Sequence, residues 1–182
     1  MDGLLQKRAA APAALFQRYG RDVQRILGRI LGVDSELPDL TQEVFLRALE
    51  GIERIDDPCR LRGWLMSTAV YAAREVIRRR RRRWWPVLLS QTHVVEPAVQ
   101  AADHCAREAV RATYALLDKI DPDDRIALSL HVFEGMELTD TASACGVSLA
   151  TIKRRIARGR ERFLALAAEH PALQDWIRGE EP

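Results

Sequence analysis

The stretch from residue 137 to residue 163 constrains the fold most, because it predicts two helices joined by a tight turn at Gly146. Glycine lacks a Cβ and adopts positive φ at little cost, which suits such a turn. Ser148 is a good N-cap for the second helix, because its side-chain oxygen can accept from backbone N–H groups of the first turn. Three apolar residues at helical spacing predict that helix's buried stripe: Ile152, Ile156 and Phe163. The pattern is typical of a helix-turn-helix, whose second helix enters the DNA major groove.

The outer faces of this second helix are strongly basic. From Ser148 to Phe163 there are six cations and one acid, Glu161. Clustered cations attract nucleic acid, because each neutralised phosphate releases condensed counterions. An ordinary amphipathic helix with a solvated basic face is the alternative. It explains the charges, but not the small-residue helix and the glycine turn directly before them.

The first half of the chain predicts three amphipathic helices, over about 9–31, 38–51 and 61–83. The third ends in six consecutive arginines, Arg78 to Arg83. Such a run repels itself, and guanidinium groups suit phosphate, so we expect it to face a polyanion. A solubilising tail or an RNA-binding arm is the alternative explanation of the run.

Trp84-Trp85-Pro86 ends the helical pattern, which resumes near Cys105. Two helices are expected next, over about 107–120 and 125–134, separated by a capping turn at Asp121-Pro122. The second should bury five apolar side chains: Ile126, Leu128, Leu130, Val132 and Phe133. No run alternates with period two for long enough to indicate a confident strand. We therefore expect an all-α chain of two small domains, an N-terminal helical bundle over 8–84 and a C-terminal four-helix domain with the helix-turn-helix over 107–170, joined by a linker over 85–106.

Composition excludes several classes of protein. The chain has 182 residues and a net charge of +2, so its charge clusters carry more information than its total. Three cysteines without a CxxC pair argue against a disulfide framework. The histidines have no ligand spacing, and no acids cluster as in a catalytic centre. We expect no enzyme activity, no metal, no cofactor, no signal peptide, no membrane insertion and a cytoplasmic location.

The segment Asp39-Leu40-Thr41-Gln42-Glu43-Val44-Phe45-Leu46-Arg47-Ala48 closely resembles the DLVQEVFLRA motif of extracytoplasmic-function (ECF) sigma factors, a group of bacterial RNA polymerase specificity subunits. The segment from Arg62 to the arginine run looks like that family's promoter-melting helix. Residues from Asp118 to Leu166 look like its domain that reads the minus-thirty-five element. The order of the segments also matches. The resemblance implies a subunit that directs core polymerase to promoters and helps to open the DNA.

The resemblance assigns roles by position. Five residues would form or support the helix that docks on the coiled coil of the polymerase's largest subunit: Asp39, Gln42, Glu43, Phe45 and Arg47. Eight residues would contact the minus-ten DNA: Asp56, Asp57, Arg60, Arg62, Tyr71, Arg74, Arg78 and Arg79. Six residues would contact the major groove of the minus-thirty-five element: Ser148, Thr151, Lys153, Arg154, Arg155 and Arg158.

Three residues depart from the family pattern. Tyr71 stands where asparagine is common, Glu75 where aspartate is common, and Arg154 where serine is usual. These departures mean that the preferred promoter sequence does not follow from the family pattern. The resemblance also implies an anti-sigma partner. The competing interpretation is a stand-alone helix-turn-helix regulator that binds duplex DNA without polymerase.

Overall fold

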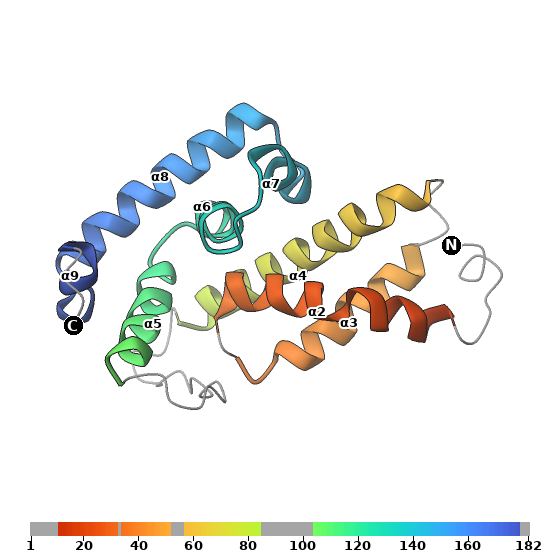
Figure 1. Ribbon diagram of the computed structural model, residues 1–182, viewed down its shortest axis with the longest axis horizontal. Helices are drawn as coiled ribbons and strands as arrows, with labels where there is room; N and C mark the ends of the chain where they lie inside the picture. The colour runs from red at the N-terminus through yellow and green to blue at the C-terminus, as the bar shows by residue number, and fades with distance from the viewer. Residues whose placement is uncertain (1–10, 33, 52–56, 85–103, 179–182) are drawn as a thin grey trace.

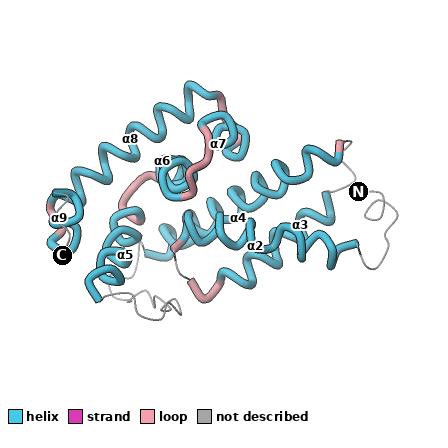
Figure 2. Tube along the Cα trace, viewed as in Figure 1, coloured by secondary structure: helices cyan, strands magenta, loops and turns pink. Residues whose placement is uncertain are grey.

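The computed structural model describes residues 11–32, 34–51, 57–84 and 104–178. Every regular element within these ranges is a helix (Figures 1 and 2), and the all-α prediction is confirmed. In chain order the elements are α2 (Ala11–Leu31), α3 (Leu37–Gly51), η2 (Pro58–Arg60), α4 (Leu61–Trp84), α5 (His104–Leu117), α6 (Pro122–Leu128), η3 (Ser129–Phe133), α7 (Leu138–Cys145), α8 (Leu149–Ala168) and α9 (Pro171–Arg178).

The helices α2, α3 and α4 pack against one another as the N-terminal bundle (Figure 1). The helix α2 ends at Leu31, and the next residue, Gly32, has a φ of 88° in the left-handed region. Gly51, at the end of α3, packs against the ring of Trp64, where a Cβ would lie 2.6 Å from Cζ2. Trp64 is thus half-buried against the bundle core. None of the described helices is long and apolar enough to cross a membrane.

The helix-turn-helix forms as the sequence predicts. Gly146 caps α7 with φ 66° and ψ 36°. The backbone N–H of Val147 donates to the carbonyl of Ala142 at 3.0 Å, which closes the turn. The side chain of Ser148 caps α8 by accepting from the N–H of Thr151 at 3.2 Å. A glycine in the left-handed region and a capping serine, both local features of the sequence, therefore set the end of α7 and the start of α8.

One predicted helix has a different shape. Asp121 caps α6 by accepting from the N–H of Asp123, but α6 ends at Leu128 and continues as the π-helical turn η3. A π turn is wider than an α turn, so the residues within it leave the phase of the preceding α-helix. Val132 is consequently 53% exposed, so the expectation that it is buried is wrong. Phe133 is half-buried.

The N-terminal bundle and the helix-turn-helix part share one core. The helix α4 packs on α6 and α7 (Figure 1). The helix α2 packs on η3. One hydrophobic cluster therefore joins bundle residues such as Leu65 and Ala69 to Ile126, Leu130 and Cys145. This packing was not expected from the sequence, in which the two halves looked separate. The expected linker lies mostly outside the described residues, and α5 begins at His104.

Candidate nucleic-acid interface

The first turns of α8 present cations to solvent. Lys153 and Arg154 are both exposed. Arg154 donates to the hydroxyl of Thr151 at 3.5 Å, and that hydroxyl lies 2.9 Å from the hydroxyl of Ser148. Of the residues expected to read duplex DNA, these four lie together on one surface at the start of α8.

The other two expected duplex readers turn towards α6. Arg155 donates to Asp123 Oδ2 at 2.9 Å. Arg158 makes a bidentate contact with the buried Asp124, at 3.0 Å from Nε and 2.8 Å from the second guanidinium nitrogen. The hydrogen bond to Asp124 raises the pKa of Arg158. The guanidinium of Arg158 nevertheless stays accessible, because its side chain is 61% exposed.

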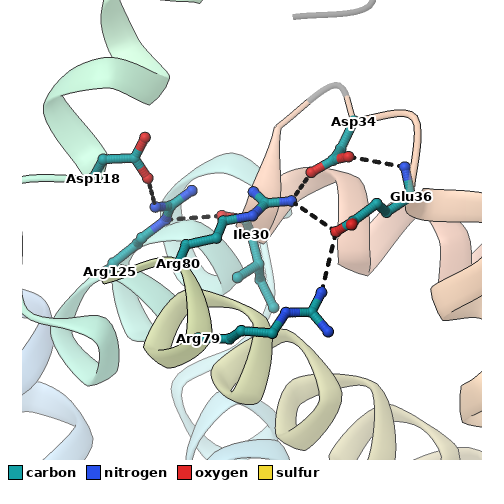
Figure 3. A network of polar contacts seen from close by, with 7 residues as sticks. All are labelled: Ile30, Asp34, Glu36, Arg79, Arg80, Asp118 and Arg125. Carbon is teal, nitrogen blue, oxygen red and sulfur yellow. Dashed lines mark hydrogen bonds and ion pairs between the residues drawn. The ribbon is translucent and has the colours of Figure 1, made fainter. Parts of the chain in front are cut away.

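The arginine run at the end of α4 is partly engaged by its own chain (Figure 3). Arg79 lies 3.3 Å from Glu36, and Arg80 contacts Asp34. Burial lowers the pKa of Arg80, and nearby Arg125 acts in the same direction. The acids of the α2–α3 turn thus relieve the self-repulsion that the sequence suggested.

Two neighbours in the run differ from this pair. Arg81 donates to the backbone carbonyls of Asp118 and Ile120, beyond the end of α5. Arg78 is exposed. The expected outward-facing arginine cluster is therefore only partly outward-facing in this structure.

The remaining expected minus-ten residues surround the start of α4. Asp57 Oδ1 accepts from the N–H of Cys59 at 2.9 Å and so closes η2. Arg60 and Arg62 are exposed, whereas Asp56 lies outside the described residues. Arg74 is farther along α4, where its Nε lies 2.7 Å from Asp123 Oδ1.

The expected polymerase-docking helix is α3. Asp39 and Gln42 are exposed and Glu43 is half-buried. Phe45 is buried, and its ring centroid lies 4.9 Å from that of Phe16. Phe45 therefore supports this helix from the core rather than from its surface.

Arg47 ties α3 to α4. Its guanidinium lies 2.6 Å from Glu43 and 2.6 Å from Glu75, and 5.6 Å from the ring centroid of Tyr71. The hydrogen bond to Glu75 is the main reason that the pKa of Arg47 is raised. Tyr71 and Glu75, the two departures in α4, thus meet at one arginine. The ring of Tyr71 remains 53% exposed.

Four acidic partners escaped the sequence analysis: Asp34, Glu36, Asp123 and Asp124. Asp123 and Asp124 lie in the first turn of α6, where acids oppose the helix dipole. Their second role depends on α8 packing on α6, which a single sequence does not reveal. Among the described residues, no three or more His, Cys, Asp or Glu side chains are placed to hold a metal ion. The exposed cations at the start of α8, Lys153 and Arg154, are instead suited to binding a polyanion.

Comparison with known families gives two matches along the chain. The family described as Sigma-70 region 2 matches residues 15–85. The family described as Sigma-70, region 4 matches residues 111–163. The first match covers most of α2 and all of α3 and α4, and the second covers most of α5 to α8.

Known relatives span most of the chain. The ECF RNA polymerase sigma factor SigC of Mycobacterium tuberculosis is 33% identical over 156 residues, covering 84% of this chain and 80% of the relative. The RNA polymerase sigma factor CarQ of Myxococcus xanthus is 29% identical over 155 residues, covering 85% of this chain and 88% of the relative.

Two solved structures have a similar fold. CnrH, solved in complex with the cytosolic domain of CnrY, gives a TM-score of 0.64 at 22% identity and covers 92% of this chain and 94% of that one. The sigma factor RpoE, solved in complex with the anti-sigma factor NepR from Bartonella quintana, gives a TM-score of 0.63 at 19% identity, covering 86% and 96%.

Proposed function

This chain belongs to the extracytoplasmic-function group of RNA polymerase sigma factors, and from that premise we propose which of its surfaces bind polymerase and promoter DNA. It directs core RNA polymerase to promoters and takes part in transcription initiation. The alternative of a stand-alone helix-turn-helix regulator is not favoured, because the relatives are polymerase sigma factors. We assign 8–84 to core binding and minus-ten DNA, 85–106 to the linker and 107–170 to minus-thirty-five DNA.

The polymerase surface is the outer face of α3. Exposed Asp39 and Gln42 offer polar contacts to the coiled coil of the largest subunit, as expected for helix-on-helix docking. On the buried side of α3, Phe45 packs into the core, and Arg47 links α3 to α4 through Glu75. Because α3 and α4 also pack directly against each other, docking of α3 also positions α4.

The minus-ten surface runs from η2 along α4. Arg60 and Arg62 are exposed at the start of the helix and Tyr71 is exposed near its middle, and an unpaired base can stack on an aromatic ring or a guanidinium plane. Unstacking one base costs a few kcal/mol, so several contacts are needed to hold it. Arg78 and Arg79 then follow the backbone of the melted strand. Asp56, Asp57 and Arg74 complete the proposed set.

The minus-thirty-five surface is the N-terminal part of α8. The observation that carries this assignment is the exposed group formed by Lys153 and Arg154 beside the Ser148 cap. Such a group combines phosphate contacts with hydrogen bonds to base edges. Thr151, Arg155 and Arg158 complete the proposed set. Arg155 must leave Asp123 before it can contribute.

The partners follow from the family. Core RNA polymerase and promoter DNA are the binding partners of this chain. We propose an anti-sigma factor as a third, since the similar sigma factor RpoE was solved in complex with the anti-sigma factor NepR. Sigma factors are initiation factors without catalysis of their own, and polymerase supplies the chemistry. We place the chain in the cytoplasm, where polymerase and the chromosome are.

Reconstitution tests the proposed function. Purified chain plus core polymerase is incubated with a library of random DNA fragments, and the transcripts are sequenced. The expected result is a shared start-site pattern with two upstream elements separated by a fixed spacing. Transcripts that begin at the same positions with and without the chain would refute it. A footprint by the chain alone on a palindromic site would instead support the stand-alone regulator.

A further inference from the structure

Arg158 differs from the other arginines of the proposed minus-thirty-five surface, because it is both held in place and exposed. Its Nε donates to one carboxylate oxygen of Asp124 at 3.0 Å, and its Nη2 donates to the other at 2.8 Å. The side chain of Arg158 is nevertheless 61% exposed, whereas that of Arg155 is only 17% exposed. Arg154 is exposed, but its hydrogen bond to the hydroxyl of Thr151 is long, at 3.5 Å. Arg158 therefore presents to solvent a guanidinium of fixed orientation.

The carboxylate of Asp124 belongs to the contact between two helices. Asp124 lies in the first turn of α6, and its side chain is only 8% exposed. The helix α8 packs on α6 at this point, with Gly159 buried beside Arg158. A buried carboxylate that loses its partner is costly, which favours retention of the ion pair. One member of the pair is thus fixed in the core, and the other reaches solvent.

Within the described part of the chain, this contact leaves one edge of the guanidinium free. The planar guanidinium has five N–H donors, and the bidentate contact uses the edge formed by Nε and Nη2. The neighbouring edge, formed by Nη1 and Nη2, keeps two parallel N–H donors. In the DNA major groove guanine offers two neighbouring acceptors, O6 and N7, whereas adenine offers an acceptor beside a donor. The free edge of Arg158 therefore matches guanine.

Charge also favours a base over a phosphate at Arg158. The carboxylate of Asp124 compensates the guanidinium charge at hydrogen-bond distance. A compensated cation attracts phosphate less strongly than a free one, such as the exposed Lys153. Hydrogen bonds to base edges carry sequence information, which phosphate contacts do not. Arg158 is therefore better suited to sequence preference than to general affinity.

Arg158 lies on the same side of α8 as two other proposed DNA contacts. Thr151, Arg154 and Arg158 are spaced three and four residues apart, so they form one row along the helix. A row of this kind on the second helix of a helix-turn-helix faces the base edges in the major groove. The held guanidinium is therefore placed where a base can be read.

On the basis of the function proposed above, we propose that Asp124 is a positioning residue, which holds Arg158 ready to read one guanine of the minus-thirty-five element. Asp124 itself does not touch DNA. It fixes the guanidinium before DNA binds, so less side-chain entropy is lost on binding. Its charge also weakens the attraction of Arg158 for phosphates at other sequences. Specificity is a difference of affinities, so both effects raise the preference for guanine.

The test compares promoter selection by variants of the full chain with core polymerase, from the same random DNA library. Arg158→Lys keeps the positive charge but loses the planar fork, so it identifies the position that Arg158 reads. Asp124→Asn removes the carboxylate charge at nearly constant volume. Glu161→Gln is the matched control, because Glu161 is exposed on α8 and makes no ion pair within the described residues. Asp124→Asn and Glu161→Gln raise the net charge equally.

The wild type should prefer guanine about tenfold or more at one position of the upstream element, and Arg158→Lys should remove most of that preference. Asp124→Asn should lower it about threefold or more at the same position and leave the other positions unchanged. The control should keep every preference. The inference is wrong if Asp124→Asn keeps the guanine preference, if it weakens all positions equally, as a purely structural role would, or if the position that responds to Arg158→Lys prefers another base.

A modified base tests the guanine contact directly. In 7-deazaguanine a C–H group replaces the N7 acceptor, and pairing with cytosine is kept. At the identified position it should weaken binding of the wild-type holoenzyme about fivefold, because one hydrogen bond is lost. It should weaken binding of the Arg158→Lys holoenzyme less than about twofold. Equal weakening of both would mean that Arg158 does not bind this base.

The Nε–H signals of arginine in NMR spectra of the free chain test the positioning without polymerase. The Arg158 signal is the one that Arg158→Lys removes. Its relaxation should match that of the α8 backbone in the wild type, and Asp124→Asn should make it as mobile as the signal of exposed Arg160. A mobile Arg158 signal in the wild type would refute the positioning. The wild-type spectrum therefore decides even if Asp124→Asn does not fold.

The two levels of the proposal can fail separately. If the Arg158 signal is rigid but core polymerase gains no promoter selectivity from the chain, the proposed function fails, and the reading of a promoter guanine fails with it. If transcription is promoter-specific but no guanine preference responds to Arg158→Lys, the proposed function stands and the role of Asp124 in reading is wrong.

Discussion

Nε of Arg125 donates a hydrogen bond of 3.0 Å to the backbone carbonyl of Ile30, and so joins α6 to the last turn of α2 (Figure 3). Arg125 is only 2% exposed, and it also contacts Asp118. The last carbonyls of a helix lack partners within it and carry partial negative charge, so a cation there is favourable. The buried guanidinium of Arg125 thus supplies a hydrogen-bond donor to the C-terminal end of α2, a helix in the other half of the chain.

Replacement of Arg125 should destabilise the chain. Arg125→Ala removes the donor to Ile30, opens a cavity and leaves a buried carbonyl without a partner, at a cost of about 3 kcal/mol in the free energy of unfolding. Arg125→Met fills the space and should cost about half as much. Urea denaturation gives both values. Lys119→Ala, at an exposed neighbouring position, should change stability by less than about 0.5 kcal/mol; equal loss in all three would contradict the assigned role of Arg125.

Gly159 should not tolerate a large side chain. A Cβ at this position would lie 3.0 Å from the backbone carbonyl oxygen of Asp124 and 3.5 Å from Cβ of Leu128. Gly159→Leu therefore forces α8 away from α6, at a cost of about 1–3 kcal/mol. Gly63 is the matched control, because a Cβ there meets nothing within 4 Å. Thermal unfolding should show a lower midpoint for Gly159→Leu. An unchanged midpoint would mean that α8 can move away from α6 at little cost in free energy.

Cys145 should make stability depend on pH in the alkaline range. Burial raises the pKa of this thiol from 9.0 to about 11. The folded state therefore keeps the proton longer than the unfolded state does. The resulting stabilisation is complete below pH 9 and is lost as pH rises towards 11, by about 2–3 kcal/mol.

Variants isolate this effect from other groups that titrate at high pH. Cys145→Ala should lose less stability than the wild type between pH 9 and pH 11, as followed by urea denaturation at each pH. Cys59→Ala serves as the control, because Cys59 is exposed. Equal pH dependence in all three proteins would show that the buried thiol does not titrate as expected.

Promoter recognition should depend on the start of α8. Replacement of Lys153 and Arg154 together by alanine removes two cations from the proposed minus-thirty-five surface. Affinity of the reconstituted holoenzyme for its selected promoter duplex should fall about tenfold or more, and the slope of log affinity against log salt should flatten by about two. Binding to core polymerase, measured by gel filtration, should not change.

The matched control removes two other exposed cations of the same helix. Arg160 and Arg162 lie later in α8. Their double alanine variant has the same net charge and should keep most of the affinity. If both double variants lose affinity equally, general charge rather than the start of the helix directs binding.

The ends of several helices could be predicted from the sequence alone. Gly146, Ser148 and Asp121 were identified as a turn, an N-cap and a capping acid, and the structure confirms each. These features depend on one residue and its nearest neighbours, so the local sequence is sufficient. The burial predicted for Val132 is wrong because this residue lies in a π turn, which changes the helical phase, and no local residue pattern indicates that turn.

The sequence by itself determined an all-helical chain, the helix-turn-helix and the two concentrations of arginine, because periodicity, capping and charge clustering are properties of neighbouring residues. Only the tertiary structure decided which arginines face solvent and which face an acid of the same chain. The partners of Arg74, Arg155 and Arg158 lie 32 to 49 positions away in the sequence. Such pairs form only when packing brings distant helices together, and the buried core shared by α4, α6 and α7 is what does so.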